Sequence, residues 1–248
     1  MDRYKGILLC SDLDGTLRNS KGEISEKNLK AIEYFCQNGG LFTLCTGRAA
    51  SYSKELVNKG LVLNTVLITL NGAMIYDIAS DKVLYENPLD REKLLGIESF
   101  IQENSELIQD IVFHCKTSKR DYKEVGDEKL YKIVFVSKTP DESKKLRKRL
   151  EKKYADDFFI TNSWPIGLEI LAKKSTKGEC IKNIKKFIPQ EIKKVVCVGD
   201  YENDISMLKA ADVSFAVKNA IPDVLKTATK ITVSNDEDAL AKIIFDEL

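Results

Sequence analysis

Histidine is almost missing from this sequence, and that scarcity limits the chemistry that the protein can perform. His114 is the only histidine among 248 residues. A Ser-His-Asp or Cys-His catalytic arrangement needs a histidine as its base, and zinc sites commonly use one as a ligand. His114 lies within the run IVFHCKTS (111–118), where an ordinary strand residue is the simpler interpretation. The sequence therefore favours neither kind of site.

Paired cysteine motifs are also lacking, although the chain has six cysteines. No C-x-x-C pair occurs. Cys10, Cys45 and Cys197 lie in or beside apolar runs, and the other three are scattered. This distribution is typical of small buried hydrophobic residues rather than of disulfides or metal ligands.

Long apolar runs and a strong charge of either sign are absent as well. No stretch reaches the roughly 18 apolar residues of a membrane span, and MDRYKG at the start does not resemble a signal peptide. The formal net charge of +1 gives no electrostatic reason to bind nucleic acid. The lysine-rich segment 144–153 could be such a patch, but its helical apolar spacing favours the solvated side of an amphipathic helix. We expect a cytoplasmic protein without a membrane or nucleic-acid partner.

Short apolar runs alternate with helical patterns in the first and last parts of the chain. Strands are predicted at 6–11, 41–46, 65–70, 193–199, 213–217 and 230–233. Helices are predicted at 25–40, with Ser25 as N-cap, and from about 50 to 59. Val/Ile/Leu runs that alternate with helices are typical of a parallel sheet covered on both faces.

The middle of the chain has a different pattern. Longer and more polar strands are predicted at 111–118, 130–137, 157–163 and 167–173, with helices at 90–104 and 139–154. This pattern indicates an α+β unit, with a sheet expected to be antiparallel. We therefore predict a doubly wound α/β core of residues 1–84 and 174–248, with an inserted α+β domain at 85–173.

Two acidic clusters directly follow predicted strands. GILLCSDLDGT (6–16) contains Asp12 and Asp14, and VVCVGDYEND (195–204) contains Asp200, Asn203 and Asp204. One Asp-x-Asp alone would suit an ordinary turn. Because the carboxyl ends of parallel strands share one edge of a sheet, the two clusters are expected to meet there. Oxygen ligands without histidine suit Mg²⁺, which would neutralise their repulsion.

Groups that could bind a phosphoryl group follow other predicted elements. A carboxylate beside a metal ion can attack, or act as a base toward, a metal-bound phosphoryl group. Thr46 and Gly47 in LCTGR offer a hydroxyl and backbone N–H groups near a helix start. Lys177 in STKGE offers a positive charge, although a surface lysine is the ordinary interpretation of that motif taken alone.

The order DLDGT, TGR, lysine and GD-x-x-ND resembles the haloacid dehalogenase-like phosphohydrolase superfamily. TLNGAMIY (69–76) and the α+β insert look like the Cof-type sugar-phosphatase branch with a C2B cap. The resemblance covers essentially the whole chain. It implies a Mg²⁺-dependent phosphatase that hydrolyses small phosphomonoesters, such as sugar phosphates or related metabolites, through an aspartyl-phosphate. A phosphomutase and a non-catalytic metabolite sensor are the alternatives on the same fold.

The resemblance also implies roles for individual residues. Asp12 would be the nucleophile, and Asp14 the general acid and then the base. Mg²⁺ would bind the Asp12 carboxylate, the Asp14 backbone carbonyl and Asp200. The phosphoryl group would contact Thr46, Gly47, Lys177 and Asn203, while Asp204 would support the metal from outside its ligand set.

Four further positions have two interpretations each. Arg48 either lines the pocket or pairs with a nearby acid, and Asn71 either lines the pocket or makes a turn. Trp164 either faces the substrate or packs in the insert. Asn219 in AVKNA resembles a family loop, but Lys218 departs from the family pattern. The substrate and the choice between a monomer and a small homo-oligomer stay open at this stage.

Overall fold

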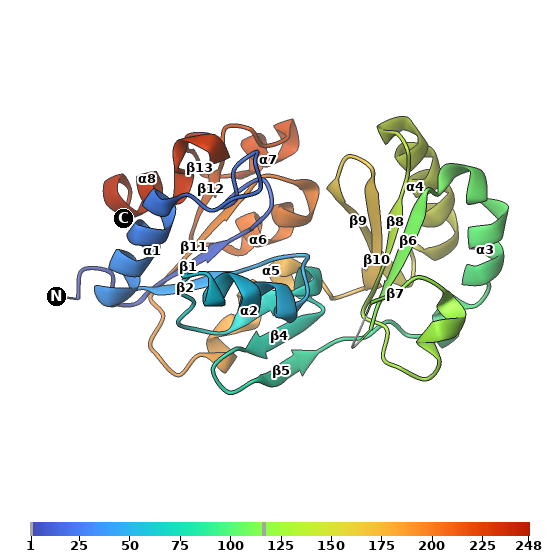
Figure 1. The fold of residues 1–248 in the computed structure, drawn as a ribbon, viewed down its shortest axis with the longest axis horizontal. Helices are drawn as coiled ribbons and strands as arrows, with labels where there is room; N and C mark the ends of the chain where they lie inside the picture. Colours follow the sequence, from blue (N-terminus) through green and yellow to red (C-terminus); the bar gives the residue numbers. More distant parts are fainter. Residues whose placement is uncertain (1, 116–117) are drawn as a thin grey trace. The chain divides into compact units, whose positions relative to one another are not determined.

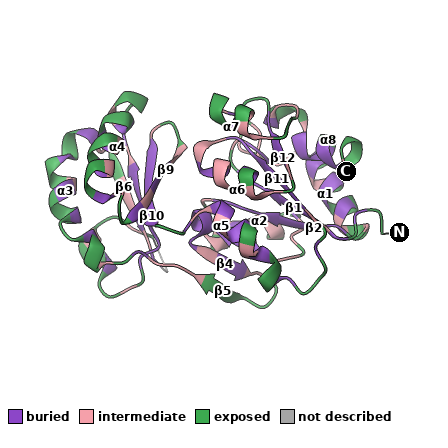
Figure 2. Cartoon of the chain, turned by 180° about the vertical axis from the view of Figure 1, so that it is seen from behind, coloured by how far each residue is buried: buried purple, intermediate pink, exposed green. Residues whose placement is uncertain are grey.

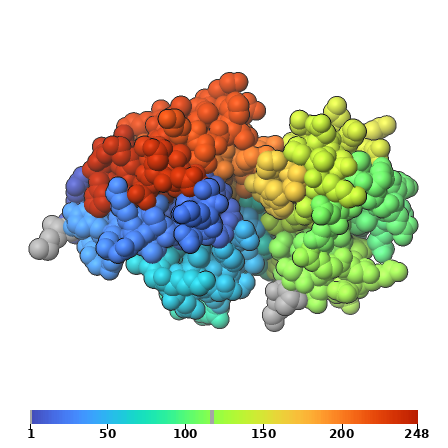
Figure 3. Space-filling model, turned by 45° about the horizontal axis from the view of Figure 1, so that its top comes forward, coloured from blue at the N-terminus to red at the C-terminus, as the bar shows by residue number. Residues whose placement is uncertain are grey.

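The computed structural model describes residues 2–115 and 118–248. They form two compact units: one combines the chain up to Tyr85 with Thr176–Leu248, and the other is Glu86–Ser175. Figure 1 shows each unit as a ribbon, and Figure 3 shows the N-terminal (blue) and C-terminal (red) segments packed side by side within the first unit. The protein is α/β, as the sequence predicts.

The first unit contains a five-stranded parallel sheet. Its strands are β1 (Ile7–Ser11), β2 (Leu41–Leu44), β11 (Lys194–Gly199), β12 (Val213–Ala216) and β13 (Lys230–Ile231), in the order β13-β12-β11-β1-β2. The strand order therefore runs in opposite directions from β1, which makes the boundary between β1 and β11 the switch point of the sheet.

Helices cover both faces of this sheet. They are α1 (Glu26–Gln37), α2 (Ala50–Asn58), α5 (Lys177–Asn183), α6 (Ile205–Ala210), α7 (Pro222–Thr227) and α8 (Ala239–Asp246). α1 packs against α8, and α5 packs against α6 on the opposite face (Figure 1). Right-handed crossovers that leave the switch point in opposite directions place their helices on opposite faces. Ser25 caps α1 by accepting from the Asn28 amide, as predicted.

The central strands are buried between these helices, which explains their continuous apolar sequences (Figure 2). Cys10 on β1 lies opposite Cys197 on β11. Five of the six cysteines are buried, Cys36 is half-buried, and all six are free. Their interpretation as small core residues is confirmed.

The predicted strand at 65–70 does not continue the parallel sheet. β3 (Leu67–Thr69), β4 (Met74–Asp77) and β5 (Lys82–Glu86) form a separate three-stranded sheet, and β3 pairs antiparallel with β4. A single parallel bridge joins Ile68 to Cys45 after β2. The chain reverses because Leu70, Asn71 and Gly72 all have positive φ (52°, 56° and 97°). The β4–β5 hairpin was not predicted.

The second unit is an antiparallel sheet with helices. Its strands are β6 (Asp110–His114), β7 (Ser118–Lys119), β8 (Lys132–Val136), β9 (Phe158–Trp164) and β10 (Gly167–Ala172), in the order β7-β6-β8-β10-β9. The helices are α3 (Ile97–Glu103) and α4 (Pro140–Tyr154). Positions 116 and 117 of the strand predicted at 111–118 lie outside the described residues. His114 is a strand residue, as expected.

The two predicted helices of this unit differ in accuracy. α4 begins with a capping box between Thr139 and Glu142 and buries Leu146 and Leu150, which confirms its amphipathic pattern. The helix predicted at 90–104 is instead a 3-10 turn followed by α3, because Gly96 has a φ of +76° between them. Across residues 2–115 and 118–248, no helix combines the length and apolarity needed to cross a membrane.

Candidate functional site

The first acidic cluster meets the second at the switch point. Asp12 directly follows β1 and Asp200 directly follows β11, and the Asp12 amide donates to the carbonyl of Val198 at 2.9 Å. Only 6% of Asp12 and 9% of Asp200 is exposed. Neighbouring parallel strands therefore place two carboxylates side by side at the same edge of the sheet, as the sequence predicts.

Lys177, the first residue of α5, reaches this acidic group. Thr176 caps the helix, and the Lys177 side chain is fully buried. Its Nζ lies 2.5 Å from Asp12 Oδ1 and 2.6 Å from Asp204 Oδ1. Burial alone would lower the pKa of Lys177, but these two carboxylates outweigh it and raise the pKa. Lys177 is thus a permanently charged, internal cation, not the surface residue that its motif alone suggests.

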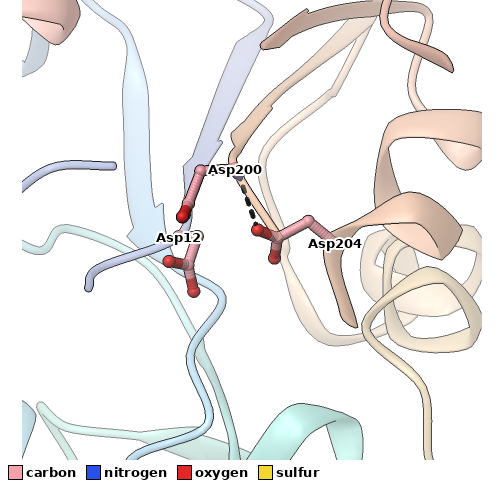
Figure 4. A group of neighbouring side chains, drawn as sticks. All are labelled: Asp12, Asp200 and Asp204. Carbon is pink, nitrogen blue, oxygen red and sulfur yellow. Dashed lines mark hydrogen bonds between the residues drawn. The ribbon is translucent and has the colours of Figure 1, made fainter. Parts of the chain in front are cut away.

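Asp204 connects the lysine with the loop after β11. Its second oxygen, Oδ2, accepts from the backbone N–H group of Asp200 at 2.9 Å (Figure 4). The same oxygen accepts from the Tyr201 amide at 3.1 Å. A Cβ on Gly199 would lie 2.6 Å from the Cβ of Asp204, so this close approach requires glycine. Both oxygens of Asp204 are therefore committed to protein groups, which suits a supporting role.

Asp12, Asp200 and Asp204 form an acidic group in which Asp12 and Asp200 could bind a metal ion and Asp204 adds negative charge. One oxygen of each lies within 4.8 Å of the others, and Figure 4 shows the three side chains converging. Burial, followed by the charge of Asp204, raises the pKa of Asp12 well above its usual range and the pKa of Asp200 to about 7. Three carboxylates with one lysine leave surplus negative charge, which a hard divalent cation would balance. The residues fit Mg²⁺.

The loop after β1 is shaped to approach Asp200. Thr16 donates its hydroxyl to Asp200 Oδ1 at 2.7 Å. Gly15 has a φ of +86°, and a Cβ there would lie 2.5 Å from Asp200 Oδ2. Asn219 donates its side-chain amide to the Gly15 carbonyl at 2.9 Å. The family-like loop at Asn219 therefore contacts the loop after β1, despite the unusual Lys218.

The side chain of Asp14 contacts arginines rather than the other three aspartates. Its side chain is 43% exposed and forms ion pairs with Arg18 and Arg48, each at 2.8 Å. Of the two interpretations of Arg48, the structure shows pairing with an acid. The Arg48 amide also donates to the Thr46 hydroxyl at 3.1 Å.

Asn71 and Asn203 lie beside the predicted phosphate-binding segment. The Asn71 amide donates to the Thr46 carbonyl at 3.0 Å, and a Cβ on Gly47 would lie 3.2 Å from the Asn71 side chain. Asn203 donates to Asn71 Oδ1 at 3.0 Å, whereas its own buried Oδ1 has no hydrogen-bond partner among the described residues. A buried acceptor without a partner is costly, so this oxygen suits a donor from a ligand. Trp164, in the second unit, lies at the end of β9 and packs on Gly167.

Nearly the whole sequence matches one known family. The haloacid dehalogenase-like hydrolase family matches residues 9–120 and 111–244. The chain belongs to this family. The motifs DLDGT, TGR and GD-x-x-ND thus occur in this haloacid dehalogenase-like hydrolase at the ends of β1, β2 and β11.

Several relatives of this haloacid dehalogenase-like hydrolase have names that state an activity. Two Bacillus subtilis proteins, the 5-amino-6-(5-phospho-D-ribitylamino)uracil phosphatases YwtE and YcsE, are 28% and 29% identical to it. The matches cover 95% and 96% of this chain and 96% and 94% of those proteins. The solved structure of a B. subtilis haloacid dehalogenase-like hydrolase has a TM-score of 0.85 and 23% identity, over 97% of this chain and 99% of that one. The names of YwtE and YcsE support a phosphatase, and the solved structure supports the fold.

Three residues of the site were missed from the sequence: Thr16, Arg18 and Tyr52. Thr16 binds Asp200, and the guanidinium groups of Arg18 and Arg48 lie over the Tyr52 ring at 5.7 and 4.8 Å. Arg18 follows Asp14 by four residues, a spacing that could have indicated an ion pair. Nothing in the sequence around Tyr52 indicates its position.

Proposed function

We propose that this haloacid dehalogenase-like hydrolase is a Mg²⁺-dependent phosphatase of small phosphomonoesters. The observation that carries the proposal is the buried contact between Asp12 and Lys177, next to Asp200 at the switch point of the sheet. A buried carboxylate beside a fixed cation suits attack on an anionic phosphoryl group, and Mg²⁺ would offset the surplus negative charge around it.

Asp12 attacks phosphorus in the first step of the proposed reaction. The bond from phosphorus to the leaving oxygen breaks as the bond to an Asp12 oxygen forms, and Asp14 gives its proton to that leaving oxygen. Lys177, Thr46, Gly47 and Asn203 bind the phosphoryl oxygens. Positioning and charge stabilisation are the main requirements of phosphoryl transfer.

Water attacks the aspartyl-phosphate in the second step. Asp14 takes the proton of that water, the bond between Asp12 and phosphorus breaks, and inorganic phosphate leaves. The Asp12 carboxylate and the proton on Asp14 are then restored. The same two carboxylates therefore serve both steps.

Asp12, Asp200 and the backbone carbonyl of Asp14 would hold Mg²⁺, with Asp204 supporting them. The ion supplies charge neutralisation and polarisation of a phosphoryl oxygen when bound. Asp204 keeps Lys177 and the loop after β11 in place through the contacts of its two oxygens.

Sugar phosphates and related metabolites are the proposed substrates. The names of YwtE and YcsE include a phosphate ester of a ribityl chain, a sugar-derived alcohol. For the present chain we propose only the substrate class, a phosphomonoester of a small polyhydroxy compound.

Phosphate release from a panel of esters tests the proposal. The panel contains sugar phosphates, sugar-alcohol phosphates and nucleotides, each with Mg²⁺ and with EDTA. We expect release that requires Mg²⁺ and that falls about 10³-fold or more in Asp12→Asn. Asp223→Asn is the control, because the Asp223 side chain is 75% exposed and its ion pair with Lys226 is long, at 3.9 Å.

The alternatives give different results in the same assay. A phosphomutase would consume substrate without releasing an equal amount of phosphate. A metabolite sensor would bind an ester without turnover, in the wild type as in Asp12→Asn. Failure of folded, Mg²⁺-loaded wild type to release phosphate from every ester would contradict the proposed function.

A further inference from the structure

The Asp14 carboxylate receives three N–H donors although it is substantially exposed. Arg18 donates from Nη1 to Oδ1 at 2.8 Å, and Arg48 donates from Nε to Oδ2 at 2.8 Å and from Nη2 to Oδ1 at 3.2 Å. The two guanidinium groups thus hold both oxygens from two directions. Oδ1 takes two donors and Oδ2 one, so Oδ2 keeps more capacity to exchange a proton.

Arg18 is itself fixed at both its side chain and its backbone. Its Nε donates to the Gly22 carbonyl at 2.6 Å, and its carbonyl accepts from the Asn235 side chain at 2.9 Å. A Cβ on Gly22 would lie 2.8 Å from Nη2 of Arg18, so glycine leaves room for the guanidinium there. The Arg18 side chain is only 20% exposed. Asp14 therefore binds a pre-organised partner, not a mobile surface side chain.

Stability does not account for this arrangement. An exposed ion pair typically contributes about 0–1 kcal/mol, because solvent screens the charges and two side chains lose freedom. Orientation has a larger effect, since proton transfer requires the acid within hydrogen-bond reach of the leaving oxygen. An unbound, 43% exposed carboxylate would sample several rotamers.

We propose that Arg18 is a positioning residue that fixes the orientation of the Asp14 carboxylate for proton transfer to the leaving group; this inference rests on the proposed function. Arg48 shares the contact, but it also lies beside Thr46 in the predicted phosphate-binding segment. Among the described residues, the side-chain hydrogen bonds of Arg18 go to Asp14 and Gly22, and its guanidinium also lies 5.7 Å from the centre of the Tyr52 ring. Replacing Arg18 therefore alters the Asp14 contact without removing a hydrogen bond to the phosphate-binding segment.

Arg18→Met tests the inference with two esters of different leaving groups. An alkyl leaving group such as a sugar needs a proton, whereas p-nitrophenolate leaves without one. We expect kcat/KM for the best sugar phosphate to fall about 10- to 100-fold, part of the effect typical of a general acid. For p-nitrophenyl phosphate we expect a change below about threefold. Arg149→Met is the matched control, since Arg149 also pairs with an exposed acid, Glu106, at 2.8 Å.

Equal losses for both esters, or no loss for either, would overturn the positioning role. Crystal structures of wild type and Arg18→Met give an independent readout that needs no activity. We expect one Asp14 orientation in the wild type; in the variant, where Arg48 alone still donates to the carboxylate, we expect that orientation to change or to become more than one. A single unchanged orientation in both would refute the inference. A wild type that hydrolyses neither ester would contradict the proposed function instead, and the crystal structures would still test Arg18.

Discussion

Each unit buries a lysine, but the two lysines have different surroundings. In the first unit, Lys177 contacts two carboxylates, Asp12 and Asp204, and Asp200 adds a third acid nearby. In the second, Lys132 on β8 pairs with Glu169 on the neighbouring strand β10 at 3.0 Å. A lysine and a glutamate that pair across a ladder suit a structural role. Surplus acid at strand ends indicates a group that the chain itself does not supply.

The largest expected effect comes from removing the cation of the first unit. Lys177→Met leaves Asp12 and Asp204 buried without their partner, so we expect the free energy of unfolding without metal to fall by about 3–5 kcal/mol. Phosphate release should be lost as well. Chemical denaturation followed by circular dichroism measures the stability. Lys193→Met, whose side chain is 67% exposed, is the control and should change stability by less than about 0.5 kcal/mol. Equal effects of both substitutions would contradict the comparison.

Mg²⁺ should distinguish the two buried ion clusters directly. At 100 times its Kd, an ion that binds only the folded state adds about 2.7 kcal/mol of stability. We expect Mg²⁺ to raise the melting temperature of the wild type and EDTA to reverse that rise. Asp200→Asn should lose the response, whereas Glu169→Gln should keep it even if its own baseline is lower. A response that survives in Asp200→Asn would place the ion elsewhere.

Gly15 offers a smaller test of the crowding around Asp200. Gly15→Ala adds a methyl group at a positive φ and 2.5 Å from Asp200 Oδ2, so we expect a loss of about 2–3 kcal/mol and a weaker response to Mg²⁺. Gly60→Ala is the matched control, because Gly60 has a φ of +101° and nothing within 4 Å of its Cβ position. It should cost about 1–2 kcal/mol and leave the Mg²⁺ response unchanged. Identical Mg²⁺ responses in the two variants would argue against the close approach of Gly15.

The smallest expected effect concerns the sole histidine, in the second unit. Burial, then the charges of Lys132 and Arg120, lower the pKa of His114 to about 3. An unfolded histidine has a pKa near 6.5, so between about pH 6.5 and 3 the unfolded chain binds more protons than the folded one. The contribution of neutral His114 is complete above this window and declines as the pH falls.

We expect the wild type to lose about 1–2 kcal/mol more than His114→Gln between pH 7.5 and 5. Nuclear magnetic resonance can follow the Cε1 proton without overlap, because no other histidine is present. Its chemical shift should stay nearly constant down to pH 5. A titration midpoint near pH 6.5 would show that the His114 ring is protonated as in an unfolded chain, and would contradict an influence of Lys132.

The sequence predicts the fold and the site best where a local residue pattern and a general rule of sheet topology lead to the same result. Apolar runs indicate β1 and β11, and the rule that parallel strands share one edge predicts that Asp12 and Asp200 lie together. The N-cap Ser25 follows from the same kind of local chemistry. These features depend on short segments or on a general property of parallel sheets.

The missed features depend on contacts that no short segment encodes. The turn interpretation of Asn71, followed by Gly72, is confirmed by the positive φ of both residues, but Leu70 also has a positive φ and its sequence does not indicate it. Burial of Lys177 depends on two acids, one of them 165 residues away, that compensate its charge. The contact between Arg18 and Asp14 could not be predicted because the direction of the Arg18 guanidinium depends on its hydrogen bond to Gly22 in the following turn.

The pairing of β1 with β11 also has a consequence for the order in which the protein can be assembled during synthesis. β1 pairs with β11, and Asp200 follows Asp12 by 188 residues. At about 5–20 residues per second, a ribosome needs roughly 10–40 s to add that length. Glu86–Ser175 is complete before then and has its own core. Until β11 emerges, β1 lacks one of its two neighbours in the sheet, and the acidic edge has not yet formed.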